Sequence, residues 1–146
     1  MIKYFNAEDI RERVTEIVLK LEMEHVNLER VSCIRSKGSG ARGTIARCHA
    51  LPKIMQLSMH CEPFYIIEVL SEEFDRMSHE NQTKVLIHEL LHVPKTFGGG
   101  FKHHDYVNDR MVERFYQQFV KGKSQEVQEE DFREKFNKTI KDIFKK

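Results

Sequence analysis

Cysteine is scarce in this chain of 146 residues, and its pattern excludes two classes of small protein. The three cysteines, Cys33, Cys48 and Cys61, are odd in number, widely spaced and without a CxxC pair. A disulfide framework needs paired cysteines, and a cysteine zinc ribbon needs closely spaced pairs. We therefore expect three reduced thiols in an intracellular protein.

Long apolar runs and a strong net charge are also absent. No window approaches the roughly 20 apolar residues that cross a bilayer. The N-terminal stretch MIKYFNAEDIRER carries acidic residues in place of the apolar core of a secretion signal. The net charge of +1 gives no overall attraction to nucleic acid or to an anionic membrane. We expect a cytoplasmic protein with no membrane partner, and its oligomeric state stays open.

Four stretches place apolar residues at helical spacing, and all but the second, which is apolar nearly all round, have a polar opposite face. Asn6 and Ser78 are suited to cap the first and second of them. Pro94 disfavours helix at the residue before it, so the second helix should end at His92. The predicted helices span residues 7–24, 79–92, 104–120 and 126–144.

The region between the first two helices has short extended segments in place of helical spacing. Residues 28–36 alternate apolar and polar side chains, and residues 64–70, FYIIEVL, form an aromatic and β-branched run typical of a buried strand. Further extended segments are predicted at residues 44–52 and 53–60. We expect an α+β fold in which a small mixed sheet packs on the helix of residues 79–92.

The domain organisation follows from the same pattern. We expect one domain over residues 1–146, with a core of about residues 7–120 and a C-terminal helical extension at residues 121–146.

Residues 88–92 read HELLH, inside a helix that is apolar nearly all round. His88 and His92 lie one turn apart on the same helix face, close enough to bind one ion. Zinc binds neutral imidazole nitrogens at about 2.0–2.1 Å, and two such ligands form half of a tetrahedral site. Glu89 is rotated by about 100° from His88, beside the position of a zinc-bound water. This is the chemistry of the HExxH motif, in which the glutamate takes a proton from that water and returns it to the leaving amine. The alternative is a metal-free helix with two hydrogen-bonded core histidines.

A catalytic zinc site also needs a third protein ligand. His104 lies across a glycine-rich stretch from the motif, and Glu113 lies within the next predicted helix. The HExxHxxGxxH pattern is absent, because Lys95 stands in the place of its glycine and Gly98 in the place of its third histidine. Spacing alone leaves five candidates, His103, His104, Asp105, Asp109 and Glu113, of which the two aspartates are the weaker ones.

The segment HELLHVP, followed by a phenylalanine, glycines and a histidine at a helix start, resembles a group of small metallopeptidases from archaea and phages that are relatives of the SprT-like zincins. The stretches ALPKIMQ, FYIIEVL and FDRMS are similar to the same group, so the resemblance covers about residues 40–110. Matching GGGFKHH to the glycine-rich segment of that group implies that His104 is the third ligand. Asp105 stands where SprT itself has a glycine, which implies a different local backbone.

The resemblance implies a zincin-like fold, in which an edge strand of the sheet pairs with an extended peptide substrate. The predicted protein is a zinc metallopeptidase in which His88, His92 and His104 bind Zn²⁺ and Glu89 is the general base. Its substrate is a peptide or protein. One alternative is a zinc hydrolase acting on nucleic acid, which the near-neutral charge disfavours. Another is a non-catalytic module with a closed structural zinc.

A DNA contact is a weaker prediction. SprT-like relatives act on DNA-bound proteins, and residues 133–146 are rich in lysine. Acidic residues interrupt the lysines, however, which favours an ordinary solvated helix face.

Overall fold

The computed structural model describes residues 1–102, 106–122 and 126–144. Its strands are β1 (Lys3–Asn6), β2 (Val31–Lys37), β3 (Ala46–Ala50) and β4 (Tyr65–Leu70). Its helices are α1 (Glu8–Lys20), α2 (Lys53–Met59), α3 (Ser71–Phe74), α4 (His79–Leu91), α5 (Asp109–Lys121) and α6 (Glu126–Phe144), with a 3-10 turn at Leu28–Arg30. A small four-stranded sheet with six helices confirms the predicted α+β class.

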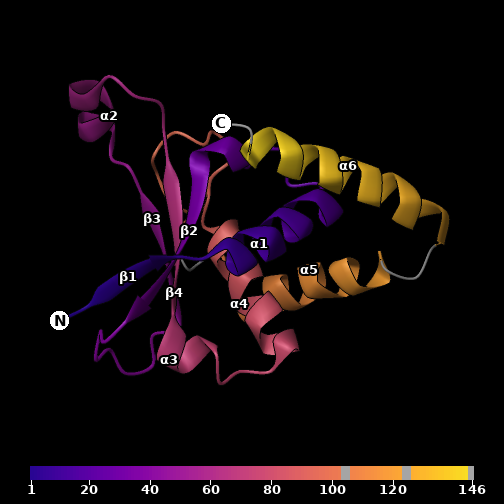
Figure 1. Cartoon of the computed structure of the whole chain (residues 1–146), viewed down its shortest axis with the longest axis horizontal. Coiled ribbons are helices and arrows are strands. Elements are labelled where there is room, and N and C mark those ends of the chain that lie inside the picture. The colour runs from indigo at the N-terminus through magenta and orange to yellow at the C-terminus, as the bar shows by residue number, and fades with distance from the viewer. Residues whose placement is uncertain (103–105, 123–125, 145–146) are drawn as a thin grey trace.

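The sheet has the order β1-β2-β4-β3, so β1 and β3 are its two edges. β2 and β4 run parallel, and each edge strand is antiparallel to its neighbour. Helices α1, α4, α5 and α6 all lie on one side of the sheet, as Figure 1 shows. The central strand β4 is buried as its apolar sequence predicted. Its helix-facing residues Tyr65, Ile67 and Val69 are fully buried.

Helix α4 lies in the interior between the sheet, α1 and α5. Leu86, Ile87 and Leu90 have no exposed surface, and α1 contributes Ile10 and Val14 to the same core. Burying side chains of this size stabilises the fold by about 1.5–3 kcal/mol each. This burial fixes the position of the HELLH segment, because α4 cannot shift without exposing apolar surface.

Two segments differ from the prediction. Residues 53–60 were predicted to be extended, but Lys53–Met59 forms helix α2, which follows Pro52 at φ −62°. Proline favours a helix start, and Lys, Met, Gln and Leu are good helix formers, whereas an isolated strand here would have no partner. The segment Lys3–Asn6 forms edge strand β1, which was not predicted. Asn6 therefore does not cap α1; Ala7 holds that position without a side-chain cap.

After α4, the start of one helix also differs from the prediction. α5 begins at Asp109 and not at residue 104, because the Asn108 side chain accepts a hydrogen bond from the Met111 amide at 2.9 Å and caps the helix there. The last helix spans residues 126–144 as predicted, and it packs along α1. Ser78 caps α4 as predicted, by accepting from the Asn81 amide.

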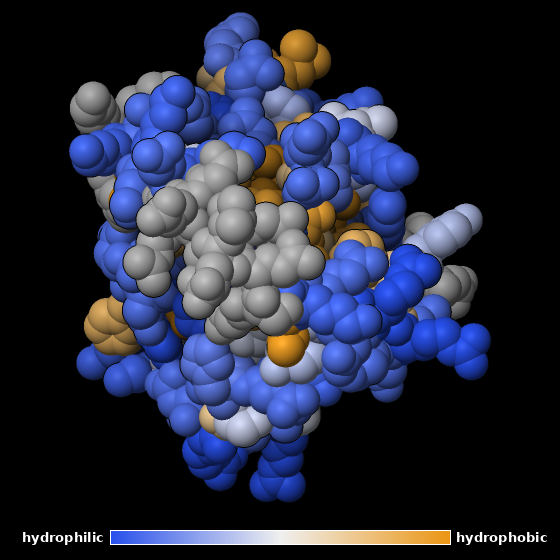
Figure 2. All heavy atoms as spheres, turned by 90° about the vertical axis from the view of Figure 1, so that its right-hand side faces the viewer, coloured by the Kyte–Doolittle hydropathy of each residue, from blue (hydrophilic) through white to orange (hydrophobic). Residues whose placement is uncertain are grey.

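The described surface is largely polar. On the side shown in Figure 2, hydrophilic residues predominate and hydrophobic ones are scattered. Exposed large hydrophobic side chains include Ile54 and Leu57 on α2, which are 76% and 78% exposed, and Tyr4 and Tyr106 elsewhere. In the part of the chain that the structure describes, no helix has the length and apolarity that a membrane crossing requires.

A polar cluster lies on the face of the sheet away from the helices. Glu68 in β4 is 3% exposed and accepts hydrogen bonds from Ser36 Oγ at 2.5 Å and His49 Nε2 at 2.7 Å. The Arg47 guanidinium lies 3.5 Å away. Burial alone would raise the pKa of Glu68, but the two hydrogen bonds and the positive charge of Arg47 outweigh burial and lower it. The cluster joins three neighbouring strands and stabilises edge strand β3.

We predict that Glu68→Gln lowers the free energy of unfolding at pH 7 by about 1–2 kcal/mol, since charged hydrogen bonds are lost. A lowered carboxyl pKa adds stability above the ordinary value of 4.5 and loses it as the pH falls through the folded value. Urea denaturation from pH 7 to pH 3 should therefore show the difference between the two proteins shrinking on the acid side. Glu12→Gln on the exposed face of α1 is the control, and a pH-independent difference for Glu68→Gln would contradict the account.

Candidate metal centre

His88 and His92 come together at the C-terminal end of α4. Their Nε2 atoms lie 3.1 Å apart, and their ring planes meet at 75°. The sequence predicted this proximity, because residues four apart share one helix face. His92 is the C-cap of the helix and is buried, whereas His88 is half-buried. The two nitrogens face each other, and such a pair needs a proton or a cation between them.

The orientation of His92 is fixed by the backbone of Lys102. His92 Nδ1 donates to the Lys102 carbonyl at 2.7 Å, because a carbonyl can only accept. The Lys102 amide in turn donates to the His92 carbonyl at 2.8 Å. With its proton on Nδ1, neutral His92 presents the lone pair of Nε2 toward His88. A hydrogen bond from the second ring nitrogen to a carbonyl is the usual orienting contact of a metal-binding histidine.

The spacing of the two imidazoles fits a zinc ion. Two nitrogens bound to one tetrahedral zinc at 2.0–2.1 Å lie about 3.3 Å apart. The observed 3.1 Å separation is close to that value. The pair can therefore hold half of a tetrahedral ion with little rearrangement.

The loop that carries Lys102 is held by a tyrosine that sequence reasoning missed. The Tyr65 hydroxyl donates to the Gly100 carbonyl at 2.8 Å and accepts from the Gly99 amide at 2.9 Å. Gly99 has φ +105°, and a Cβ there would come within 2.7 Å of the Leu51 carbonyl oxygen. Gly99, the central one of three consecutive glycines, therefore occupies a backbone position that only glycine can adopt. No local pattern in the sequence links Tyr65 to this loop.

Glu89 is buried next to the histidine pair without a partner for its charge. Only 8% of the residue is exposed, and burial raises the pKa of its carboxyl group to about 7. Within residues 1–102, 106–122 and 126–144 the carboxylate makes no hydrogen bond or ion pair. A buried carboxyl group without a partner is costly to fold and is typical of a group that a ligand completes.

Two hollows open onto Glu89, one on each side of it. The larger, of about 660 Å³, also contains His88, and the smaller, of about 330 Å³, also contains His92. Both are walled by edge strand β3, which packs against α4. The larger is lined by Gly43, Thr44, Ile45, Ala46, Met77, Asn81, Lys84, Val85, His88, Glu89, Asp109, Val112 and Glu113. The smaller is lined by Ala46, Arg47, Cys48, Glu89, His92, Phe101 and Lys102.

The candidates for a third ligand divide into two groups. Glu113 lines the larger hollow, but its carboxylate is engaged by Lys84 Nζ at 2.7 Å and by the Gln117 amide at 2.9 Å. No three His, Cys, Asp or Glu side chains come together as a metal site among the residues that the structure describes. His104, with its neighbours His103 and Asp105, lies outside the described residues.

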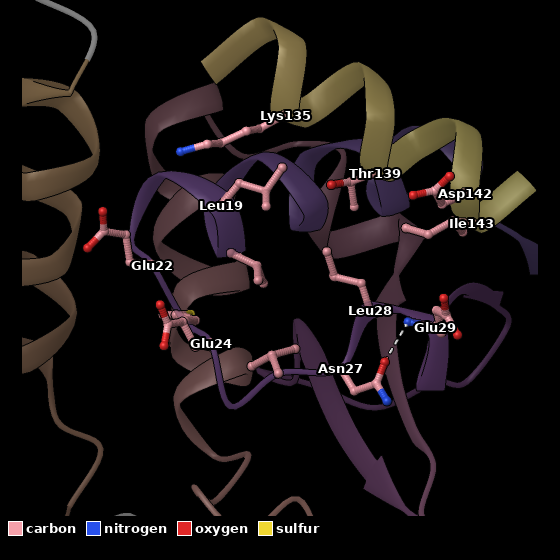
Figure 3. A pocket seen from close by; sticks show the side chains of 13 residues that line it. Leu19, Glu22, Glu24, Asn27, Leu28, Glu29, Lys135, Thr139, Asp142 and Ile143 are labelled. Carbon is pink, nitrogen blue, oxygen red and sulfur yellow. Dashed lines mark hydrogen bonds between the residues drawn. The ribbon is translucent and has the colours of Figure 1, made fainter. Parts of the chain in front are cut away.

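A further hollow, of about 680 Å³, lies between the end of α1 and α6. Figure 3 shows Glu22 and Glu24 on one side of it and Lys135, Thr139 and Asp142 on the other. Carboxylates line this hollow, but its described lining contains no histidine or cysteine. Its described lining offers no imidazole or thiolate ligand for zinc, so the candidate metal centre is at the end of α4.

We predict that Glu89→Gln stabilises the metal-free protein by about 1–3 kcal/mol at pH 8, because a neutral amide replaces an ionised carboxylate without a partner. The measurement is urea denaturation in the presence of a chelator. Glu24→Gln, at an exposed position, should change stability by less than about 0.5 kcal/mol. Destabilisation by Glu89→Gln would show that the carboxylate has a stabilising partner in the folded protein.

Comparison with known proteins gives a family match that covers nearly the whole chain. A family model described as "Putative phage metallopeptidase" matches residues 2–141. No curated protein and no solved structure matches the chain.

Proposed function

The chain belongs to the phage metallopeptidase family, and from that premise we propose that it is a zinc-dependent peptidase of the HExxH type, with the whole of residues 1–146 as one zincin-like domain. The observation that carries this proposal is the placement of a buried carboxyl group, Glu89, beside two imidazole nitrogens 3.1 Å apart. The family gives a reaction class, and this geometry supports His88, His92 and Glu89 as the groups that perform the reaction.

His88 and His92 supply two nitrogen ligands in the proposed site. When bound, a zinc ion lowers the pKa of a water molecule and polarises a carbonyl group. His92 is held in the ligating tautomer by the Lys102 carbonyl. His88 is placed by the rigid turn of α4 that separates the two histidines.

Glu89 is proposed to act as the general base and then as the general acid. Its carboxyl group has a pKa raised to about 7 by burial, so it can both take and return a proton near neutral pH. It takes a proton from the water that attacks the substrate carbonyl, and it then gives this proton to the leaving amine. Burial excludes bulk water that would compete for that proton.

His104 is proposed as the third ligand. Lys102 is anchored to His92 by two hydrogen bonds. His104 follows Lys102 by two residues, and two residues of chain span at most about 7 Å. The engagement of Glu113 by Lys84 supports the choice of the histidine.

Edge strand β3 is proposed as the docking strand for substrate. In the described sheet β3 pairs only with β4, so its outer edge carries backbone groups that an extended peptide can pair with. β3 walls both hollows beside Glu89. A peptide laid along it would therefore pass over the candidate metal centre.

The test is cleavage of a synthetic peptide library by the zinc-loaded protein and by Glu89→Gln. Removing a general base should lower kcat by at least about 100-fold, while the zinc content stays unchanged because the glutamate is not a ligand. Full activity in Glu89→Gln would overturn the assigned role, and an absence of cleavage by the wild type would overturn the peptidase proposal. A chelator should abolish wild-type cleavage, and added zinc should restore it.

A further inference from the structure

The larger hollow changes character along its length. It begins at Glu89 and His88 and continues past Val85 to Lys84 on α4. These positions extend about 6 Å along the helix axis. Facing Val85, Ile45 and Val112 complete an apolar middle section. The side chain that fits has an aliphatic stem several carbons long.

The lining of the hollow has more carboxylates than cations, with Glu89, Asp109 and Glu113 against Lys84. The Lys84 ammonium is bound by Glu113 at 2.7 Å and by Glu80 at 3.2 Å, so its charge is already neutralised. Asp109, in the first turn of α5, adds a further carboxylate to the lining. Lys84 is the only lysine or arginine among the described residues that line this hollow. An acidic side chain is disfavoured here, and a cationic one is favoured.

A second observation supports a ligand site in this hollow rather than a solvated acidic surface. Glu89 is only 8% exposed as a residue, lines the same hollow, and its carboxylate has no hydrogen-bonding partner among the described residues. The proposed reaction brings a peptide carbonyl to that carboxylate. With a peptide paired to β3, we expect the side chain of a residue next to the cleaved bond to enter the hollow, which β3 borders at Ala46.

We propose that the α4–α5 hollow is the specificity pocket of this peptidase, and that it selects lysine or arginine at a residue adjacent to the cleaved bond. The inference rests on the proposed function and adds the chemical class of substrate to it. The aliphatic stem packs on Ile45, Val85 and Val112, and the cationic end meets the Asp109 carboxylate and shares Glu113 with Lys84.

Three matched peptides test the proposal. A cleavage site is first located by mass spectrometry in a peptide library, and its pocket residue is then made lysine, norleucine or glutamate. Norleucine keeps the aliphatic stem and lacks the charge. We expect kcat/KM to be roughly fivefold higher for lysine than for norleucine, as for a half-exposed ion pair. The glutamate peptide should be the poorest of the three. Equal or better cleavage of the norleucine peptide would overturn the charge selection.

The test variants remove the charges of two exposed carboxylates that line the hollow, Asp109 and Glu113. Asp109→Asn combined with Glu113→Gln should reduce the lysine preference to near unity while cleavage of the norleucine peptide is retained. Both positions are exposed, so folding should be unaffected. Glu22→Gln combined with Glu24→Gln, at the α1–α6 hollow, is the matched control and should keep the full preference. An unchanged preference in the Asp109 and Glu113 double variant would overturn the assignment of the pocket.

The peptide results distinguish the specificity inference from the peptidase proposal. If all three peptides are cut in a zinc- and Glu89-dependent manner but without a lysine preference, the peptidase proposal stands and the specificity inference falls. If no library peptide is cut, the peptidase proposal falls, and the inference falls with it.

Discussion

The candidate centre depends on the double hydrogen bond between His92 and Lys102. It fixes the imidazole so that Nε2 faces His88, and it also returns the chain to the end of α4 after the glycine-rich loop. Tyr65 holds the same loop from the central strand of the sheet. The position of the histidine pair is therefore determined by the core of the fold, because Tyr65 and α4 are both buried there.

The cost of this arrangement falls on Glu89. A charged group without a partner in the described interior disfavours folding, and the surrounding apolar core offsets that cost. In the proposed site, function and stability therefore oppose each other at one residue, as is common where a buried group is kept available for a ligand. By contrast, Glu68, which is as deeply buried, receives hydrogen bonds from Ser36 and His49.

Some local features were predictable from the sequence, whereas the long-range ones that shape the site were not. The proximity of His88 and His92 follows from one helix turn, and the cap at Ser78 follows from its side chain. The segment 53–59 was misread because seven residues with mixed polarity fit either a strand or a helix, and only the absence of a pairing partner decides. The identity of β3 as the free edge beside α4 depends on strand order, which the sequence pattern does not encode. The link from His92 to Lys102 depends on a loop conformation set by Gly99 and Tyr65.

The central claim is that His88 and His92 hold a metal ion, and the most direct test is the metal content of protein purified without a histidine tag. The account predicts about one zinc per chain in the wild type and a sharp loss in His92→Ala. His79→Ala, at the exposed start of the same helix, should keep the wild-type content. A wild type that binds no metal even after incubation with zinc would contradict the account, because the facing nitrogens would then be joined by a proton alone.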